Sequence, residues 1–444
     1  MSLTRRTVIN SAAAAMATPM FSRPLFAAAT DVIVVGAGSA GISAARELIA
    51  RGLQVQVIEA DGRIGGRVFS ETTTFGVPYD VGAHWLHYRE ANPFVDYGLE
   101  NGFDLYAAPS DEIYYVGDRP ATDEELSVFG DAMDTANGAM LTAGRQGQDV
   151  AASEVVPDLG EWGLTTSLFT GAYEMAKDPD QFSCADWYTA EDGTDWYCRE
   201  GFGALFAHSA RDAKVTLNTK AQKIRWGGQG VEVETNNGIL SARAVVITVS
   251  TGVLASGDIK FDPPLPDKKQ EAVNALKMGH YHHVALQLND NFFGIGEDGY
   301  FGYKITEDSN GAPKGFAALV DACGHGITYC DIGGAFAKEM SALGGAAMYD
   351  FVIGDLKKIF GSKVEKVILK SNTFDWTKHP LTQGAYASAE PGGAWSRAEL
   401  RRPESERLWF AGEATSVDDW ATVAGAHKSG VAVAAQIAKS ISPT

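Results

Sequence analysis

Three closely spaced glycines, Gly36, Gly38 and Gly41, have the spacing in this sequence that points most directly to chemistry. They follow residues 31–35, an apolar and largely β-branched run that is typical of a parallel strand buried on both faces. Glycines in this pattern permit a tight turn, a close approach of the backbone to a pyrophosphate, and close packing of a helix on the strand. The helix N-terminus adds N–H donors and a positive dipole end. The spacing therefore predicts a dinucleotide site.

The segments after these glycines continue the pattern. An apolar stripe that includes Ile42 and Leu48 predicts a helix ending near Gly52, and residues 54–58 predict a second buried strand. That strand is followed by Glu59, whose carboxylate is placed to accept hydrogen bonds from an adenosine ribose. We expect a Rossmann-like α/β arrangement here.

A second glycine-rich turn comes directly afterwards. Gly65 and Gly66 lie between Arg63 and Arg67, which combines backbone N–H donors with bidentate guanidinium groups. Such a turn suits a cofactor whose pyrophosphate continues into a flavin, and it favours FAD over NAD. The stretch 59–68 resembles the flavin-containing amine oxidase family, which includes monoamine and polyamine oxidases.

The resemblance continues along the chain in the order expected of that family. Its further blocks are residues 80–87, 215–218, 244–249, 261–266, 376–386, 408–416 and a final helix from about residue 422. It implies FAD that is bound but not covalently attached, because Ala385 stands where monoamine oxidases carry the cysteine linked to the flavin. The implied FAD-binding residues are Gly36, Gly38, Ser39, Ala40, Gly41, Glu59, Ala60, Arg67, Gly82, Ala83, His84, Trp85, Ala221, Gly412, Glu413, Thr422 and Val423. The N-terminus of the final helix would face the flavin and favour negative charge on its reduced form.

The same resemblance divides the chain into two domains. Residues 30–90, 200–275 and 395–440 would form a Rossmann-like FAD-binding domain from three discontinuous segments. Residues 91–199 and 276–394 would form an α+β substrate-binding domain.

Residues 1–29 differ in composition from the rest of the chain. They contain the pair Arg5-Arg6, an alanine-rich apolar stretch and the triplet 27–29 of alanines, a pattern typical of a twin-arginine export signal with its cleavage site. The pattern predicts a periplasmic protein that takes up its cofactor before export. The alternative is a disordered or helical N-terminal arm.

The composition restricts the classes of partner. The formal net charge is −19, and 45% of the residues are hydrophobic, so a folded protein that attracts small cations is expected and nucleic acid is not. No apolar run approaches the roughly 20 residues that span a bilayer. The four cysteines, which show no CxxC spacing, are Cys184, Cys198, Cys323 and Cys330.

Two aromatic residues are candidates for a cage around an amine. The resemblance places Tyr386 on one side of that cage. The second aromatic position of the family falls on Thr422, and Trp420 is either its substitute or a tryptophan of the core or rim.

Three polar side chains are candidates for the chemistry itself. His87 falls where polyamine oxidases carry a histidine or an acid at the cavity, with a structural histidine as the alternative. Glu174 resembles an acid that faces the tunnel in plant polyamine oxidases, with a solvated helix residue as the alternative. His283 stands where family members usually carry a lysine that holds a water against flavin N5. This substitution leaves open whether oxygen or an electron-carrier protein is the acceptor.

The histidines at 280, 282 and 283 do not predict a metal centre. Alternation along a strand puts at most two of them on one face, and the sequence shows no third ligand nearby. We expect no metal.

The resemblance implies oxidation of a polyamine, diamine or similar cationic amine. The amine would pass a hydride to flavin N5, and the resulting imine would hydrolyse to an aldehyde or ketone plus an amine. One alternative is an oxidase or dehydrogenase of a secondary or heterocyclic amine, as in nicotine degradation. The other is a redox-silent flavoprotein that binds a partner. The sequence does not decide between a monomer and a homodimer.

Overall fold

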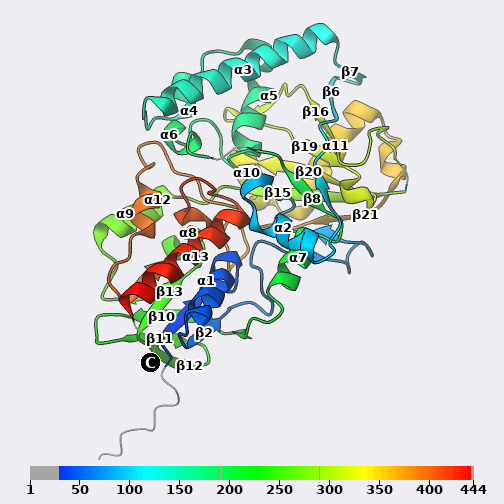
Figure 1. The fold of residues 1–444 in the computed structure, drawn as a ribbon. Coiled ribbons are helices and arrows are strands. Elements are labelled where there is room, and N and C mark those ends of the chain that lie inside the picture. The colour runs from blue at the N-terminus through cyan, green and yellow to red at the C-terminus, as the bar shows by residue number, and fades with distance from the viewer. Residues whose placement is uncertain (1–29, 191–192, 290, 442–444) are drawn as a thin grey trace, which may run out of the picture.

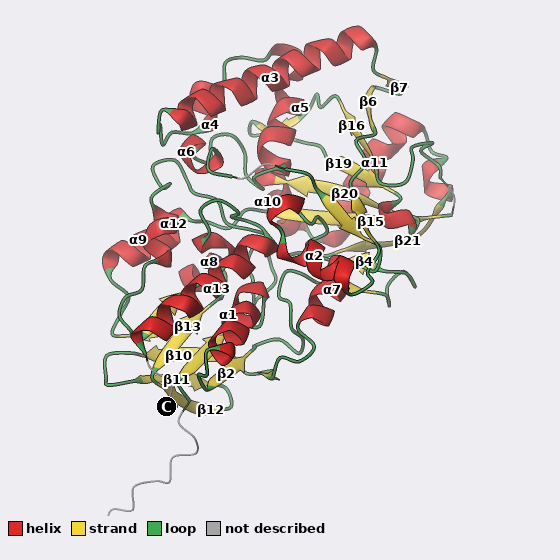
Figure 2. Cartoon of the chain, viewed as in Figure 1, coloured by secondary structure: helices red, strands yellow, loops and turns green. Residues whose placement is uncertain are grey.

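The computed structural model describes residues 30–190, 193–289 and 291–441, so the predicted export signal lies outside the described residues. The chain forms two layered parts, which Figure 1 shows below and above the middle of the view. Helices cover the sheets of both parts (Figure 2).

A five-stranded parallel sheet with the order β22-β13-β1-β2-β9 is the centre of one part. Its strands are β1 (Val32–Val35), β2 (Val55–Ile58), β9 (Val215–Thr216), β13 (Ala244–Ile247) and β22 (Leu408–Phe410). They come from three separated stretches of the chain, in agreement with the predicted fold class. Both β1 and β13 are buried along their whole length, which explains their continuous apolar runs.

Alternate residues of β1 face two different cores, because side chains alternate across a strand. Val32 and Val34 belong to the core shared with α1 (Ser39–Ala50) and α13 (Val423–Ser440). Ile33 and Val35 belong to the core on the opposite face, shared with a second sheet of order β12-β11-β10-β14. Its strands are β10 (Ala221–Arg225), β11 (Val231–Thr235), β12 (Gly238–Ala242) and β14 (Lys260–Asp262).

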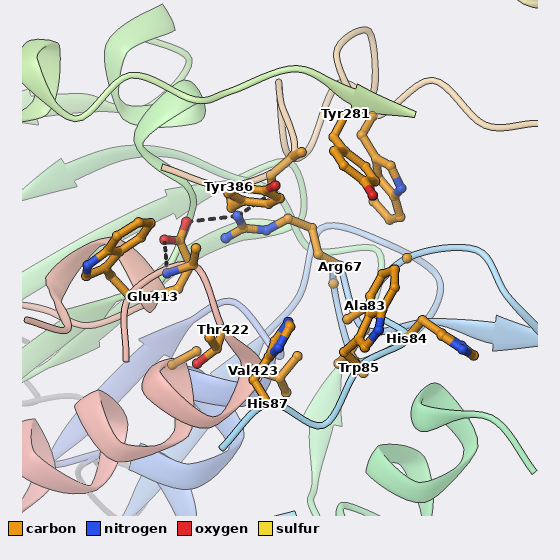
Figure 3. Close-up of a pocket in the computed structure, with 18 of the residues that line it drawn as sticks. Arg67, Ala83, His84, Trp85, His87, Tyr281, Tyr386, Glu413, Thr422 and Val423 are labelled. Atoms are coloured by element: carbon orange, nitrogen blue, oxygen red, sulfur yellow. Dashed lines mark hydrogen bonds and ion pairs between the residues drawn. The ribbon is translucent and has the colours of Figure 1, made fainter. Parts of the chain in front are cut away.

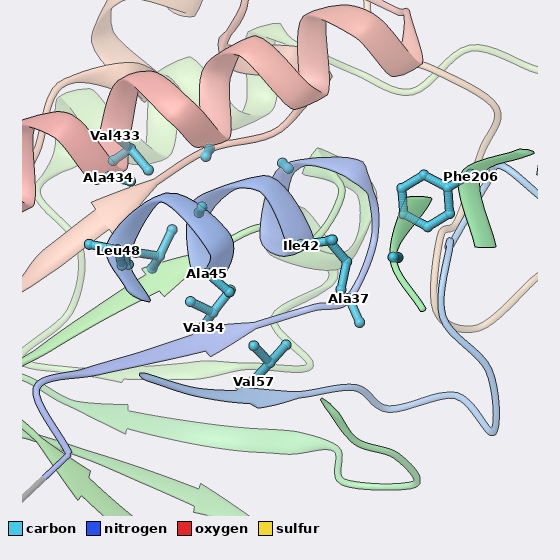
Figure 4. Packing of buried hydrophobic residues seen from close by; sticks show 14 of the residues in the cluster. Val34, Ala37, Ile42, Ala45, Leu48, Val57, Phe206, Val433 and Ala434 are labelled. Atoms are coloured by element: carbon cyan, nitrogen blue, oxygen red, sulfur yellow. The ribbon is translucent and has the colours of Figure 1, made fainter. Parts of the chain in front are cut away.

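Helices α1 and α13 lie directly against each other (Figure 4). Only a glycine at position 430 permits this approach, because a Cβ there would stand 2.2 Å from the carbonyl oxygen of Ala40. At the start of both helices, the hydroxyl of Ser39 donates a hydrogen bond of 2.8 Å to the carbonyl of Val423. The two N-termini, each a positive dipole end, are thereby held side by side.

A seven-stranded mixed sheet with the order β21-β15-β20-β19-β16-β6-β7 is the centre of the other part. Its strands are β6 (Glu112–Val116), β7 (Arg119–Pro120), β15 (Tyr281–Leu288), β16 (Gly299–Tyr303), β19 (Ala317–Val320), β20 (Ile327–Gly333) and β21 (Ile368–Thr373). Strands β6 and β16 pair in parallel and the other neighbours are antiparallel. His283 on β15 is paired in register with Asp331 on β20.

The helices of this part include the long helix α3 (Asp123–Arg145), which begins with a capping box between Thr122 and Glu125. Helices α10 (Gly334–Leu343) and α11 (Gly345–Phe360) pack on the mixed sheet, and α5 (Gly163–Ser167) continues into the π-helical turn η3 (Leu168–Tyr173). The other α-helices of the described chain are α2 (Pro93–Glu100), α4 (Ala152–Val155), α6 (Cys184–Trp187), α7 (Phe202–Ser209), α8 (Thr251–Ser256), α9 (Asp267–Ala275) and α12 (Ser396–Arg401).

The described chain also contains three short two-stranded sheets. They are formed by β3 (Ser70–Glu71) with β4 (Tyr79–Asp80), β5 (Leu105–Ala107) with β8 (Trp196–Cys198), and β17 (Asp308–Ser309) with β18 (Ala312–Pro313). Among the residues that the structure describes, no helix has the length and apolar character needed to cross a bilayer.

Candidate active site

A large cavity of about 1620 Å³ runs from the parallel sheet to the mixed sheet. Its walls contain the predicted catalytic residues Tyr386, His283, His87, Glu174 and Trp420. They also contain every predicted FAD-binding residue except Gly41. A Cβ at Gly41 would stand 2.0 Å from the carbonyl oxygen of Gly36, so this glycine shapes the turn from inside and does not face the cavity.

The end of the cavity at the parallel sheet is suited to a pyrophosphate. Gly36 has φ +109°, and a Cβ there would meet the hydroxyl of Thr248 at 2.4 Å. Gly38 faces open space, with no atom closer than 3.8 Å to an added Cβ. Helix α1 begins after Gly38 without a side-chain cap and without an acid in its first turn. Its free N–H groups therefore offer an anion site.

Glu59 holds the turn that contains these glycines. One carboxylate oxygen accepts a hydrogen bond of 2.7 Å from the N–H of Ala37, and the other accepts one of 2.8 Å from Asp61. Burial raises the pKa of Glu59 above its ordinary value, although the backbone hydrogen bonds oppose this. Glu59 lines the cavity, so the carboxylate also faces the place of a ribose.

Further along the cavity, Arg67 and Glu413 join the first and last stretches of the parallel-sheet part. The guanidinium of Arg67 donates a hydrogen bond of 2.9 Å to the carboxylate of Glu413 and one of 2.7 Å to the carbonyl of Ala385 (Figure 3). Glu413 also accepts hydrogen bonds from the N–H groups of Ala387 and Ala421. The ion pair holds these loops together at the wall of the cavity.

The N-terminus of α13 points into the same region. The hydroxyl of Thr422 accepts a hydrogen bond of 2.8 Å from the N–H of Gly425, so this side chain caps the helix. Trp420 is 6% exposed and packs in a core with Met140 and Phe182, and its ring lies 4.6 Å from the guanidinium of Arg397. Trp420 is therefore a core residue that also forms part of the cavity wall.

The residues of this cavity fit FAD. The open surfaces at Gly38 and Gly412, neither of which would bring an added Cβ within 3.4 Å of a neighbour, leave room for a ligand against the backbone. Two helix N-termini face the cavity, one beside the glycine turn and one beside Arg67. Donors for a pyrophosphate and a positive dipole for an electron-rich ring are therefore both present.

Tyrosines form the wall opposite this region. The rings of Tyr386 and Tyr281 are 6.2 Å apart, and Tyr281 and Tyr173 are 5.9 Å apart. Tyr386 donates hydrogen bonds of 3.1 Å to the carbonyls of Tyr173 and Glu174, and the hydroxyls of Tyr173 and Tyr300 are bonded to each other. Sequence reasoning identified only Tyr386, because the others come from elements that meet it only in the folded chain.

His283 lies beside this wall with a partner that the sequence did not reveal. Its Nδ1 is hydrogen-bonded to Asp331, and its Nε2 lies 3.4 Å from the carbonyl oxygen of Gly82. Burial acts to lower the pKa of His283, but the charge and hydrogen bond of Asp331, aided by Gly82, outweigh burial and raise this pKa. A protonated imidazole is therefore favoured at this wall.

His87 and Glu174 line the cavity where it is more exposed. His87 Nδ1 lies 3.0 Å from the carboxylate of Asp195, and its ring stacks on Trp85 at 6.2 Å. Glu174 accepts a hydrogen bond of 2.8 Å from the indole N–H of Trp187. Asp195 was not identified from the sequence, since it is distant from His87 along the chain and has no motif around it.

His84 is among the residues that line the cavity, but its side chain is almost completely buried. It is 2% exposed, its Nδ1 lies 2.8 Å from Asp80, and its ring is directed away from Tyr386 and Tyr281 in Figure 3. Its neighbour Trp85 faces the cavity, and the indole N–H of Trp85 donates a hydrogen bond of 3.1 Å to the hydroxyl of Tyr197.

A glycine cradle at the ends of a parallel sheet, joined to an aromatic-walled cavity, defines a flavin-dependent oxidoreductase. The family model for flavin containing amine oxidoreductase matches residues 39–119 and 162–438, and the chain belongs to this family.

Individual relatives agree with this assignment. The chain is 30% identical over 436 residues to polyamine oxidase 2 of Arabidopsis thaliana, covering 91% of this chain and 87% of that protein. It is 26% identical over 465 residues to lysine-specific histone demethylase 2 of Homo sapiens, covering 98% of this chain and 57% of that protein. The structure of wild-type putrescine oxidase bound to putrescine matches the fold with a TM-score of 0.73 at 20% identity, covering 92% of this chain and 99% of that one.

The predicted fold class, the FAD cofactor and the enzyme class are thereby confirmed. The protein is an FAD-dependent amine oxidase. The comparisons favour neither the oxidase of heterocyclic amines nor the redox-silent flavoprotein.

Proposed function

We propose that this amine oxidase acts on a diamine or polyamine and that Glu174, Asp195 and His87 bind the distal positive charge of the substrate. The observation that carries the proposal is that these three side chains line the same cavity as Tyr386 and the FAD cradle. The names of the relatives, polyamine oxidase and putrescine oxidase, support the same substrate class. The net charge of −19 also favours a cationic substrate, because it attracts small cations.

The roles of the residues follow from what the reaction needs. When bound, FAD supplies the acceptor for the hydride that the α-carbon of the amine gives up. Tyr386 and Tyr281 would orient the amine with their ring faces, and the N-terminus of α13 would favour negative charge on reduced FAD. The pair of His283 and Asp331 holds a proton beside the cavity wall.

The two ends of the substrate need different surroundings. The reacting amine must be neutral, which the buried tyrosine wall favours because burial disfavours charge. A second ammonium must stay charged and find a partner, and the carboxylates of Glu174 and Asp195 provide it where the cavity is more exposed. This separation selects a cation with two amines over a monoamine.

The test compares a diamine with a monoamine of matched chain length on Glu174→Gln. A hydrogen bond to a charged group contributes about 1.5–3 kcal/mol, so kcat/KM for the diamine should fall about ten- to a hundredfold. The monoamine should be almost unaffected. Glu100→Gln, at the exposed end of α2 and outside the cavity, is the control and should change neither. Equal losses on both amines would contradict the role of Glu174.

The cellular location and the electron acceptor are separate proposals. We propose that residues 1–29 direct export to the periplasm, on the strength of Arg5-Arg6 and the alanine triplet. Changing both arginines to lysine should leave active, unprocessed protein in the cytoplasm, and undiminished periplasmic activity would reject the proposal.

Oxygen and an electron-carrier protein are distinguished by the rate at which air-saturated buffer reoxidises the reduced enzyme.

A further inference from the structure

Three buried side chains from distant parts of the chain meet behind Trp85. They are His84, which follows β4, Asp298, which precedes β16, and Cys323, in the short helix η4 (Ala322–Gly324). The three are 2%, 1% and 4% exposed. One ligand atom from each side chain lies within 4.8 Å of those of the other two. Imidazole, carboxylate and thiol are thus gathered at one point.

The imidazole of His84 has one nitrogen engaged by a carboxylate and one without a partner in the described part of the chain. Its Nδ1 is engaged by the carboxylate of Asp80 at 2.8 Å, which leaves Nε2 as the free nitrogen. Nε2 is fully buried and has no hydrogen-bond partner among the described residues. Buried polar atoms are nearly always satisfied, so this nitrogen indicates a missing partner. A carboxylate behind a histidine is also the usual arrangement that orients a metal-binding imidazole.

The other two side chains are held rigidly. One oxygen of Asp298 accepts a hydrogen bond of 2.7 Å from the N–H of Cys323, and the other accepts one of 2.5 Å from the hydroxyl of Tyr106. The guanidinium of Arg199 donates a hydrogen bond of 2.9 Å to the carbonyl of Cys323. Asp298 and Cys323 both have positive φ, 58° and 54°, which is uncommon for residues other than glycine. Each carboxylate oxygen keeps a second lone pair for a further ligand.

We propose that His84, Asp298 and Cys323 bind a divalent zinc-type cation outside the flavin chemistry. The donor set of one nitrogen, one sulfur and one oxygen is typical of zinc, and a water would complete four-coordination. Binding releases the thiol proton of Cys323 to solvent, and the thiolate and carboxylate then balance the two positive charges of the ion. The expectation of no metal rested on the histidines at 280, 282 and 283. This cluster was not identified from the sequence, because its three residues are far apart along the chain and no local pattern shows that their segments meet.

A metal ion at this site would fix the position of the cavity wall at Trp85. His84 immediately precedes Trp85, which lines the cavity, while Asp298 and Cys323 flank strands of the mixed sheet. An ion at this point ties the loop from the parallel-sheet part to the mixed sheet. This role goes beyond amine oxidation and does not depend on the identity of the amine.

The test measures metal in the purified, FAD-containing protein after incubation with excess Zn²⁺ and removal of the unbound ion. We expect one zinc ion per chain in the wild type. Cys323→Ala and Asp298→Asn should lose it, and Asp80→Asn should lower the affinity about ten- to a hundredfold through the orientation of His84. Replacement by Co²⁺ should give ligand-field absorption at wavelengths beyond the flavin bands, and this absorption should vanish in Cys323→Ala.

Two control variants test whether the loss of metal is specific to the thiol of Cys323. Cys184→Ala removes a buried thiol in α6 and should keep the metal. Cys198→Ala should also keep it, although the carbonyl of Cys198 lies 3.6 Å from the sulfur of Cys323. Retained FAD reports folding of each variant, and Asp298→Asn, which preserves the side-chain shape, replaces Cys323→Ala if the latter does not fold. Failure of the wild type to hold Zn²⁺ or Co²⁺, or equal metal loss in Cys198→Ala and Cys323→Ala, would overturn the proposal.

Discussion

The imidazole of His283 and the carboxylate of Asp331 form a buried hydrogen-bonded pair across neighbouring strands β15 and β20. Residues paired in register on adjacent strands point to the same face, so the pair is a consequence of the sheet register. It occupies the position where the resemblance to amine oxidases led us to expect a lysine. The pair supplies a proton-binding group there whose charge depends on pH.

We predict that this pair contributes a pH-dependent part of the stability. Because Asp331 raises the pKa of His283, the contribution is fully present below the unfolded-state pKa of about 6.5 and is lost as the pH rises through the folded-state pKa. The difference in free energy of unfolding between the wild type and His283→Gln should therefore shrink as the pH is raised from about 6. Denaturant titrations at a series of pH values measure it. A difference that stays constant with pH would show that His283 has the same pKa in the folded and unfolded protein, and a difference that grows with pH would show that folding lowers this pKa.

The sequence was sufficient to predict the part of the site whose residues are close together along the chain. Gly36, Gly38 and Glu59 belong to one strand–turn–helix–strand unit, so their spacing alone indicates the turn and its ligand. The partners of His283 and His87 are different, because Asp331 and Asp195 are brought in by strand pairing and loop packing that no local pattern encodes.

Local packing also decided what the sequence left open for two residues. Thr422, on which the second cage position of the family falls, caps α13 with its hydroxyl, and only the structure shows this hydrogen bond. Trp420 has both a cavity surface and a core environment, and only the folded chain shows that Arg397 and Phe182 surround it.

We predict that Thr422→Ala lowers the free energy of unfolding by about 1 kcal/mol, because α13 loses its side-chain cap. Thr422→Ser keeps the hydroxyl and should remain near the wild type. Chemical denaturation of the FAD-bound forms measures both. Equal stability of the alanine and serine variants would mean that the hydroxyl does not support the helix.

The close contact between α1 and α13 is tested by comparing a glycine-to-alanine change inside the contact with one outside it. Gly430→Ala would place a Cβ 2.2 Å from the backbone of α1, so the helices must separate and both stability and FAD retention should fall. Gly138→Ala in α3 meets no atom within 4 Å and should stabilise by up to about 1 kcal/mol through helix propensity. Thermal unfolding with flavin fluorescence follows both variants. Unchanged FAD retention in Gly430→Ala would argue against a role of this contact in holding the cofactor site.

Amine oxidation by this protein is tested most directly by mixing the FAD-bound enzyme with a diamine in the absence of oxygen and following the visible absorption of the flavin. We predict that the diamine bleaches the flavin, faster than a monoamine of the same chain length and more slowly in Glu174→Gln. A flavin that stays oxidised with every diamine, polyamine and monoamine supplied would contradict the assignment of this cavity as an amine-oxidising site.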